Sequence, residues 1–198
     1  MQSSRFFPTG LTLTLILIGL AGCAGRDLMM PNGLDKEYVP ATTPELLLEK
    51  VAQAYADRDL ECYADLLAED FVFTFLPCDV NDLGLGSDHW GREDELISAA
   101  RMFSGEPHVR DDGTVVPPIL AIEVLEFRQD VPWEDAGDRE HPGTMRAIYS
   151  MKVLFVREGA SDLVVDGPCI FFASPVRNED GQTVYRLRGW VDQTKVCS

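Results

Sequence analysis

The sequence predicts an α+β domain in which helices come first and cover one face of a curved antiparallel sheet. Apolar residues recur at helical spacing between residues 43 and 103, and strand-like runs of β-branched and aromatic residues dominate from residue 118 onward. Short turns, at Glu158 to Ser161 and at Asn178 to Gly181, separate the last three runs and favour antiparallel hairpins. Helices followed by consecutive strands are typical of α+β architecture.

Three helices are expected in the first half. The first follows Thr43, which can cap an exposed backbone N–H, has Pro44 at its first position and continues to about Asp57. A second helix is expected at Leu60 to Ala68 and a third at Arg92 to Phe103, each with apolar residues on one side.

The expected strands are rich in β-branched and aromatic residues and are bounded by turn-forming residues. They are Phe71 to Pro77, Ile119 to Arg128, Met145 to Arg157, Leu163 to Val176 and Thr183 to Asp192.

Residues 1–22 have the layout of a secretory signal. Arg5 is their one charged residue, an apolar run extends from Leu11 to Leu20, and Ala21 and Gly22 are small. Pro8 to Gly10 precede an apolar run that is shorter than the roughly 20 residues needed to span a bilayer. We therefore expect this segment to be removed after export.

The order Leu20-Ala21-Gly22-Cys23 resembles the bacterial lipobox. That resemblance implies cleavage before Cys23 and attachment of lipid to its sulfur, so that the mature protein is held on a membrane by acyl chains. Ala24 after the cysteine resembles the pattern of lipoproteins sent to the outer membrane, which implies a location in the bacterial cell envelope facing the periplasm. Residues 23–42 are expected to be a flexible tether, and residues 43–198 one folded domain.

The charge of the chain limits the classes of partner. The formal net charge is −16 at pH 7. Coulomb repulsion opposes the approach of such a chain to nucleic acid or to an anionic lipid surface. No nucleic-acid partner is therefore expected, and membrane contact should come from the N-terminal lipid alone.

Four cysteines remain after Cys23, and their pairing is open. An exported protein can form disulfides, and Cys62, Cys78, Cys169 and Cys197 allow three connectivities. A regular hairpin between the last two strands disfavours a bond between Cys169 and Cys197, because the two positions fall out of register. Buried free thiols are the alternative.

One further resemblance concerns the fold. The run AYADRDLECYADLLAEDFVFTF, the helix beginning in WGREDELISAARMF and the closing VYRLRGWVDQ resemble the NTF2-like superfamily and its SnoaL-like branch. The resemblance implies a cone in which three N-terminal helices pack on a bent antiparallel sheet, with a pocket between them. Members of this superfamily include isomerases, cyclases and dehydratases as well as domains that only bind or dimerise.

The residues expected near that pocket do not form a complete catalytic set. The candidates are Tyr55, Tyr63, His89, Trp90, Trp190 and Asp192. The resemblance places the general base of the isomerases in or just after the first strand, but there this sequence has Phe73 to Leu76, and Asp79 is the next acid. Tyrosines at helical spacing are also common core residues.

Metal and cofactor signatures are incomplete. The stretch from Asp79 to Trp90 follows part of a calcium-loop template but lacks its bidentate glutamate, and the histidines and cysteines have no zinc spacing. Phosphate-binding glycine motifs and a nucleophile elbow are absent from the sequence. We expect no metal and no cofactor.

Two classes of function remain. The first is a membrane-anchored lipoprotein with a non-catalytic domain that binds a small apolar ligand, or acts as an envelope scaffold or homodimer. The second is an isomerase, cyclase or dehydratase with His89 or Asp79 as the base and with Tyr55, Tyr63 or Asp192 as its partner. A filled pocket would separate the scaffold from both the ligand-binding domain and the enzyme, and phenylalanines at 73, 75, 171 and 172 could fill it.

Overall fold

The structure, a computed structural model, describes residues 39–76, 80, 86–110 and 113–193. Helix α1 spans Pro44–Asp57, α2 spans Leu60–Leu66 and α4 spans Arg92–Phe103. The Thr43 side chain accepts a hydrogen bond from the Leu46 amide at the start of α1, as expected of a cap.

A six-stranded sheet forms the second layer. Its order is β2-β1-β8-β7-β6-β5, and a separate ribbon pairs β3 with β4. The strands are β1 (Leu67–Thr74), β2 (His89–Gly91), β3 (His108–Val109), β4 (Val115–Val116), β5 (Ile119–Asp135), β6 (Met145–Arg157), β7 (Leu163–Arg177) and β8 (Thr183–Asp192).

The expectation of a wholly antiparallel sheet is wrong at one place. Strand β1 pairs in parallel with β8, with Phe73 opposite Trp190, whereas β5 to β8 form the expected antiparallel meander. Strands β1 and β8 lie far apart in the sequence and are not joined by a tight turn. The preference of short turns for antiparallel pairing therefore does not apply to them.

The helices also do not all precede the sheet. Strands β1 and β2 lie between α2 and α4 along the chain, and β2 pairs antiparallel with β1. Gly91, the last residue of β2, is also the N-cap of α4. The pairing of Phe73 with Trp90 therefore sets where α4 begins.

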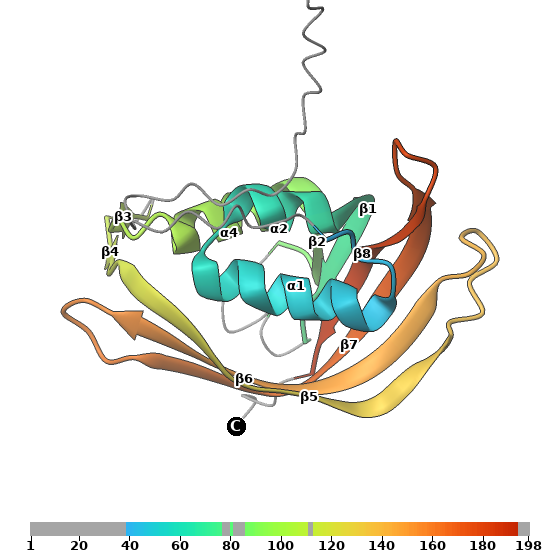
Figure 1. Ribbon diagram of the computed structural model, residues 1–198. Coiled ribbons are helices and arrows are strands. Elements are labelled where there is room, and N and C mark those ends of the chain that lie inside the picture. The colour runs from blue at the N-terminus through green and yellow to red at the C-terminus, as the bar shows by residue number, and fades with distance from the viewer. Residues whose placement is uncertain (1–38, 77–79, 81–85, 111–112, 194–198) are drawn as a thin grey trace, which may run out of the picture.

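The helices lie against the concave face of the curved sheet (Figure 1). The core between the two layers contains fully buried side chains from both. Members of this core include Leu47, Leu48 and Val51 of α1, Tyr63 and Leu66 of α2, Ala99 of α4, and Phe71, Phe171 and Leu187 of the sheet. No helix in the described residues is long and apolar enough to cross a bilayer.

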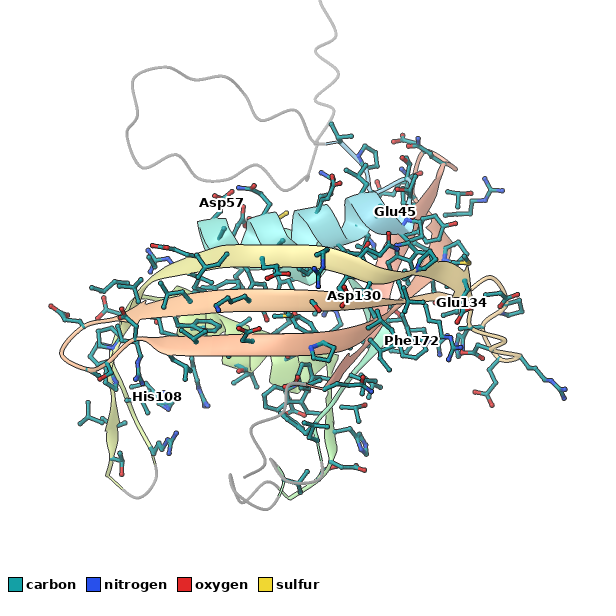
Figure 2. All side chains as sticks on the ribbon, turned by 90° about the horizontal axis from the view of Figure 1, so that it is seen from below. Glu45, Asp57, His108, Asp130, Glu134 and Phe172 are labelled. Atoms are coloured by element: carbon teal, nitrogen blue, oxygen red, sulfur yellow. The ribbon has the colours of Figure 1, made fainter. Side chains whose placement is uncertain are left out.

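The opposite face of the sheet is turned away from the helices and has both charged and apolar side chains. Figure 2 looks onto this outer face, where Asp130 and Phe172 are labelled. Asp130 forms an ion pair with Arg128 at 3.1 Å, and Lys152 forms one with Asp166 at 2.9 Å. Such exposed pairs each contribute at most about 1 kcal/mol to stability.

Candidate functional site

A buried carboxyl group lies between the helices and the sheet. Glu95, in the first turn of α4, is 3% exposed. Its Oε1 accepts hydrogen bonds from the hydroxyls of Tyr63 at 2.6 Å and Tyr55 at 3.2 Å. Its Oε2 accepts one from Nε1 of Trp90 at 3.0 Å. Together these four residues form the Glu95 cluster.

Each member of the Glu95 cluster comes from a different element. Tyr55 lies on α1, Tyr63 on α2, Trp90 on β2 and Glu95 on α4. The cluster therefore joins all three of these helices to the short strand that leads into α4.

Burial changes the acid–base properties of the cluster. Loss of water raises the pKa of Glu95, although the hydrogen bonds from Tyr63, Tyr55 and Trp90 oppose that rise. Burial also raises the pKa of Tyr55 and of Tyr63 well above the usual value, and the neighbouring carboxyl raises both further. Both phenols therefore stay protonated and act as donors at neutral pH.

An aromatic cluster surrounds these polar groups. The Tyr55 ring packs edge-on against Tyr63 at 5.0 Å and against Phe103 at 5.2 Å between ring centroids. The Trp190 ring lies 6.1 Å from Tyr55 and 4.9 Å from Phe171. These ring contacts pack the described part of the interior next to the Glu95 cluster.

A small apolar cavity is present next to the Glu95 cluster. Its volume is about 20 Å³. A single water needs roughly 10–15 Å³, and pockets for drug-sized ligands are roughly 300–1,000 Å³. The walls are apolar or aromatic side chains from α1 and from the concave face of the sheet: Val51, Ala52, Tyr55, Val124, Phe127, Met151, Val153, Phe171 and Trp190.

The predicted pocket residues have different positions in the structure. Tyr55, Tyr63 and Trp90 converge on Glu95, and Trp190 joins them through its ring contact with Tyr55. His89 does not: it is exposed and its Nδ1 lies 2.7 Å from Oδ1 of Asp88. The alternation of side chains along β2 explains this, because Trp90 faces the interior.

Asp192 is the last residue of β8 and lies apart from the Glu95 cluster. It is opposite Cys169 in the register of β7 and β8, and its Oδ1 lies 3.9 Å from the Cys169 sulfur. Burial raises the pKa of the Cys169 thiol to about 12, and the Asp192 charge adds to that rise. Cys169 is therefore a buried, protonated free thiol.

Several predicted residues lie outside the described residues. They are Cys23, Cys78, Asp79 and Cys197. Cys62, on α2, is half-buried. Among the residues that the structure does describe, no group of three or more His, Cys, Asp or Glu side chains is placed to hold a metal ion.

Sequence reasoning missed Glu95 itself. The run Arg92-Glu93-Asp94-Glu95 has the acidic character of a solvated first helical turn, where carboxylates face the positive end of the helix dipole. Glu95 nevertheless stands four residues before Ala99 and eight before Phe103, both buried, so it shares their inner face. This spacing is the feature of the sequence that predicts a buried position for Glu95.

Comparisons with known proteins place the fold. The structure is similar to a conserved protein from Planctomyces limnophilus, with a TM-score of 0.51, 12% identity and coverage of 75% of this chain and 90% of that one. It is similar to a putative scytalone dehydratase from Novosphingobium aromaticivorans, with a TM-score of 0.51, 10% identity and coverage of 77% and 81%. A match at a TM-score of 0.47 and 13% identity, covering 78% and 99%, is to an NTF2-like protein of unknown function in nutrient uptake from Rhodospirillum rubrum.

The first two similarities define the class of structure: an α+β domain with helices against a curved sheet. At these identities they establish the fold alone. The sequence matches no protein-family model and no curated protein.

Proposed function

We propose that the protein is a lipid-anchored envelope protein whose NTF2-like domain is a non-catalytic scaffold. The close packing that the described residues form next to the Glu95 cluster is the observation that carries this proposal. A cavity of about 20 Å³ has room for one water and not for a substrate. Catalysis by the Glu95 cluster would need a reacting atom within about 3 Å of its polar groups.

The hydrogen bonds of Glu95 support a structural role for the cluster. Its two carboxyl oxygens accept three hydrogen bonds from protein donors. A buried carboxylate so paired holds neighbouring elements in one arrangement, because losing any donor or the acceptor leaves a polar group unsatisfied. The cluster would then fix the helices on the sheet.

A second candidate function is an isomerase, cyclase or dehydratase. The raised pKa of Glu95 favours it, because burial makes this carboxyl a better proton acceptor than an exposed one, and two tyrosine hydroxyls beside it could hold an oxyanion. The same interior would have to open to admit a small apolar substrate.

Native mass spectrometry of the full mature chain, purified from its own envelope, tests the scaffold proposal. We expect the mass of the protein with its covalent lipid and no retained small molecule. A single chain and a self-associated species would both agree with the scaffold proposal. We propose a homodimer as the self-associated form. A retained non-covalent apolar molecule would contradict the scaffold proposal and favour ligand binding or the second candidate.

The anchor is a separate part of the proposal and has its own test. It is supported by the order Leu20-Ala21-Gly22-Cys23 and by Ala24, which suits an outer-membrane lipoprotein facing the periplasm. In cells given radioactive palmitate, we expect label on the wild-type protein and loss of label in Cys23→Ser. Cys62→Ser is the matched control and should keep the label. An unlabelled wild type would refute the lipid anchor.

A further inference from the structure

A hollow lies on the outer face of the sheet, away from the Glu95 cluster. Its volume is about 230 Å³. Side chains of β1, β7 and β8 form most of its walls, and the loop that joins β5 to β6, residues 136–144, contributes the rest. We call it the outer hollow; its lining residues are Asp70, Val72, Thr74, Asp138, Thr144, Phe172, Arg188, Gly189 and Val191.

The β5–β6 loop has its own internal hydrogen bonds. The Ala136 amide donates to the Thr144 carbonyl at 2.9 Å, and the Thr144 amide donates to the His141 carbonyl at 3.2 Å. Oδ1 of Asp138 accepts from the amides of Glu140 and His141 at 2.9 and 3.1 Å. These bonds fix Asp138 and His141 relative to each other.

His141 connects this loop to the sheet. Its Nε2 lies 3.2 Å from Oδ2 of Asp70 on β1, and its Nδ1 lies 3.4 Å from Oδ2 of Asp138 in the loop. Both ring nitrogens therefore face carboxylate oxygens. The His141 side chain is 38% exposed, so protons reach it from solvent.

This arrangement favours the protonated ring. A neutral imidazole has one N–H and one lone pair, whereas an imidazolium donates from both nitrogens. In the neutral ring, one nitrogen would present its lone pair to a carboxylate oxygen, which is repulsive. Only the protonated His141 can donate to Asp70 and Asp138 together.

The charged groups that face His141 come from three places. Asp70 comes from β1 and Asp138 from the loop. Arg188, from β8, contacts both carboxylates, at 3.0 Å to Asp70 and at 3.7 Å to Asp138. On the β7 side, the loop contacts the neutral Ser174, whose hydroxyl lies 2.8 Å from that of Thr144. Arg188 keeps its charge across the neutral range, and histidine is the residue type of this set whose ordinary pKa lies closest to neutrality.

We propose that His141 is a pH-sensitive clamp that holds the β5–β6 loop on β1 and so fixes one wall of the outer hollow. Protonation closes the clamp in mild acid. Above neutrality one of the two His141 contacts is lost, and the loop opens more often.

Amide hydrogen exchange on the full chain at pH 5.5 and 8.0, corrected for the intrinsic exchange rate at each pH, tests the clamp. The loop amides of residues 136–144 should be about fivefold better protected at pH 5.5, as expected from contacts of this exposed kind. In His141→Asn, which cannot titrate, that difference should disappear.

His89→Asn is the matched control, because His89 also lies beside a carboxylate, Asp88, but outside the loop. It should keep the wild-type difference in loop protection. Asp138→Asn is a second test and should reduce the difference even if His141→Asn fails to fold. Equal protection of the wild-type loop at both pH values, or a wild-type difference in His141→Asn, would overturn the clamp.

Discussion

Replacing Glu95 with alanine should lower the free energy of unfolding by about 3 kcal/mol. The substitution removes the acceptor of three buried donors, and each buried polar group left unsatisfied costs roughly 1–3 kcal/mol, partly offset because a buried charge is also removed. Urea unfolding followed by circular dichroism measures the change. Tyr63→Phe, which loses the 2.6 Å hydrogen bond, should cost more than Tyr55→Phe, which loses the one at 3.2 Å.

Asp94→Ala is the matched control for Glu95→Ala. Asp94 is the preceding residue in the same acidic helical turn, but it is exposed. A change within about 0.5 kcal/mol is expected there. Equal losses for the two variants would show that the acidic turn, and not the buried cluster, provides the stabilisation.

The pH dependence of Glu95→Gln gives a second readout of the same cluster. Burial raises the pKa of Glu95 in the folded state above its unfolded value of about 4.3. The stability that goes with the protonated carboxyl is therefore complete below that unfolded value and is lost as pH rises through the folded-state pKa. Glutamine does not titrate, so the stability deficit of the variant should shrink as the pH rises above the unfolded value of about 4.3.

The strongly periodic elements could be predicted from the sequence almost to the residue. Arg92–Phe103, Met145–Arg157 and Thr183–Asp192 coincide with α4, β6 and β8. These segments combine a consistent period with clear turn residues at their ends, so local preference and tertiary packing agree.

Two strands differ from prediction because tertiary pairing outweighs local preference. Residues 67–70 have helix-forming side chains, but Leu67 pairs with Leu187 and belongs to β1. Strand β5 continues past Arg128 through Pro132 to Asp135. Strand β5 is at the edge of the sheet, so one of its sides has no partner strand. A proline, which has no backbone N–H, is tolerated at an edge where that side faces solvent.

The candidate site could be predicted only in part. Its aromatic donors, Tyr55, Tyr63 and Trp90, stand out because large side chains at inner positions suggest a pocket. Their hydrogen-bond acceptor, Glu95, does not stand out in the sequence. It lies among exposed acidic residues, and only its position on the buried face of α4 distinguishes it. The volume of the cavity next to the Glu95 cluster depends on how aromatic rings from strands far apart in the sequence pack together. No local sequence pattern determines that packing.

Phe171→Ala should have the largest effect on the interior, with a loss of about 3–5 kcal/mol in the free energy of unfolding. Phe171 is fully buried and contacts the rings of Trp190 at 4.9 Å and Tyr149 at 5.9 Å between centroids. It also lines the apolar cavity of about 20 Å³, so removing its ring should enlarge that cavity. Differential scanning calorimetry measures the stability of both proteins.

The enlarged cavity also makes the proposed scaffold role testable through binding. An apolar engineered cavity stays dry and takes up small apolar molecules, and a ligand that binds only the folded state raises Tm. Saturating benzene should therefore raise the Tm of Phe171→Ala and leave the wild type unchanged. Phe172→Ala is the control from the other face of β7, where Phe172 lines the outer hollow; it should show no benzene effect. If benzene stabilises the wild type as much as Phe171→Ala, the natural interior opens to ligands, and the enzyme or binding functions become the better account of the Glu95 cluster.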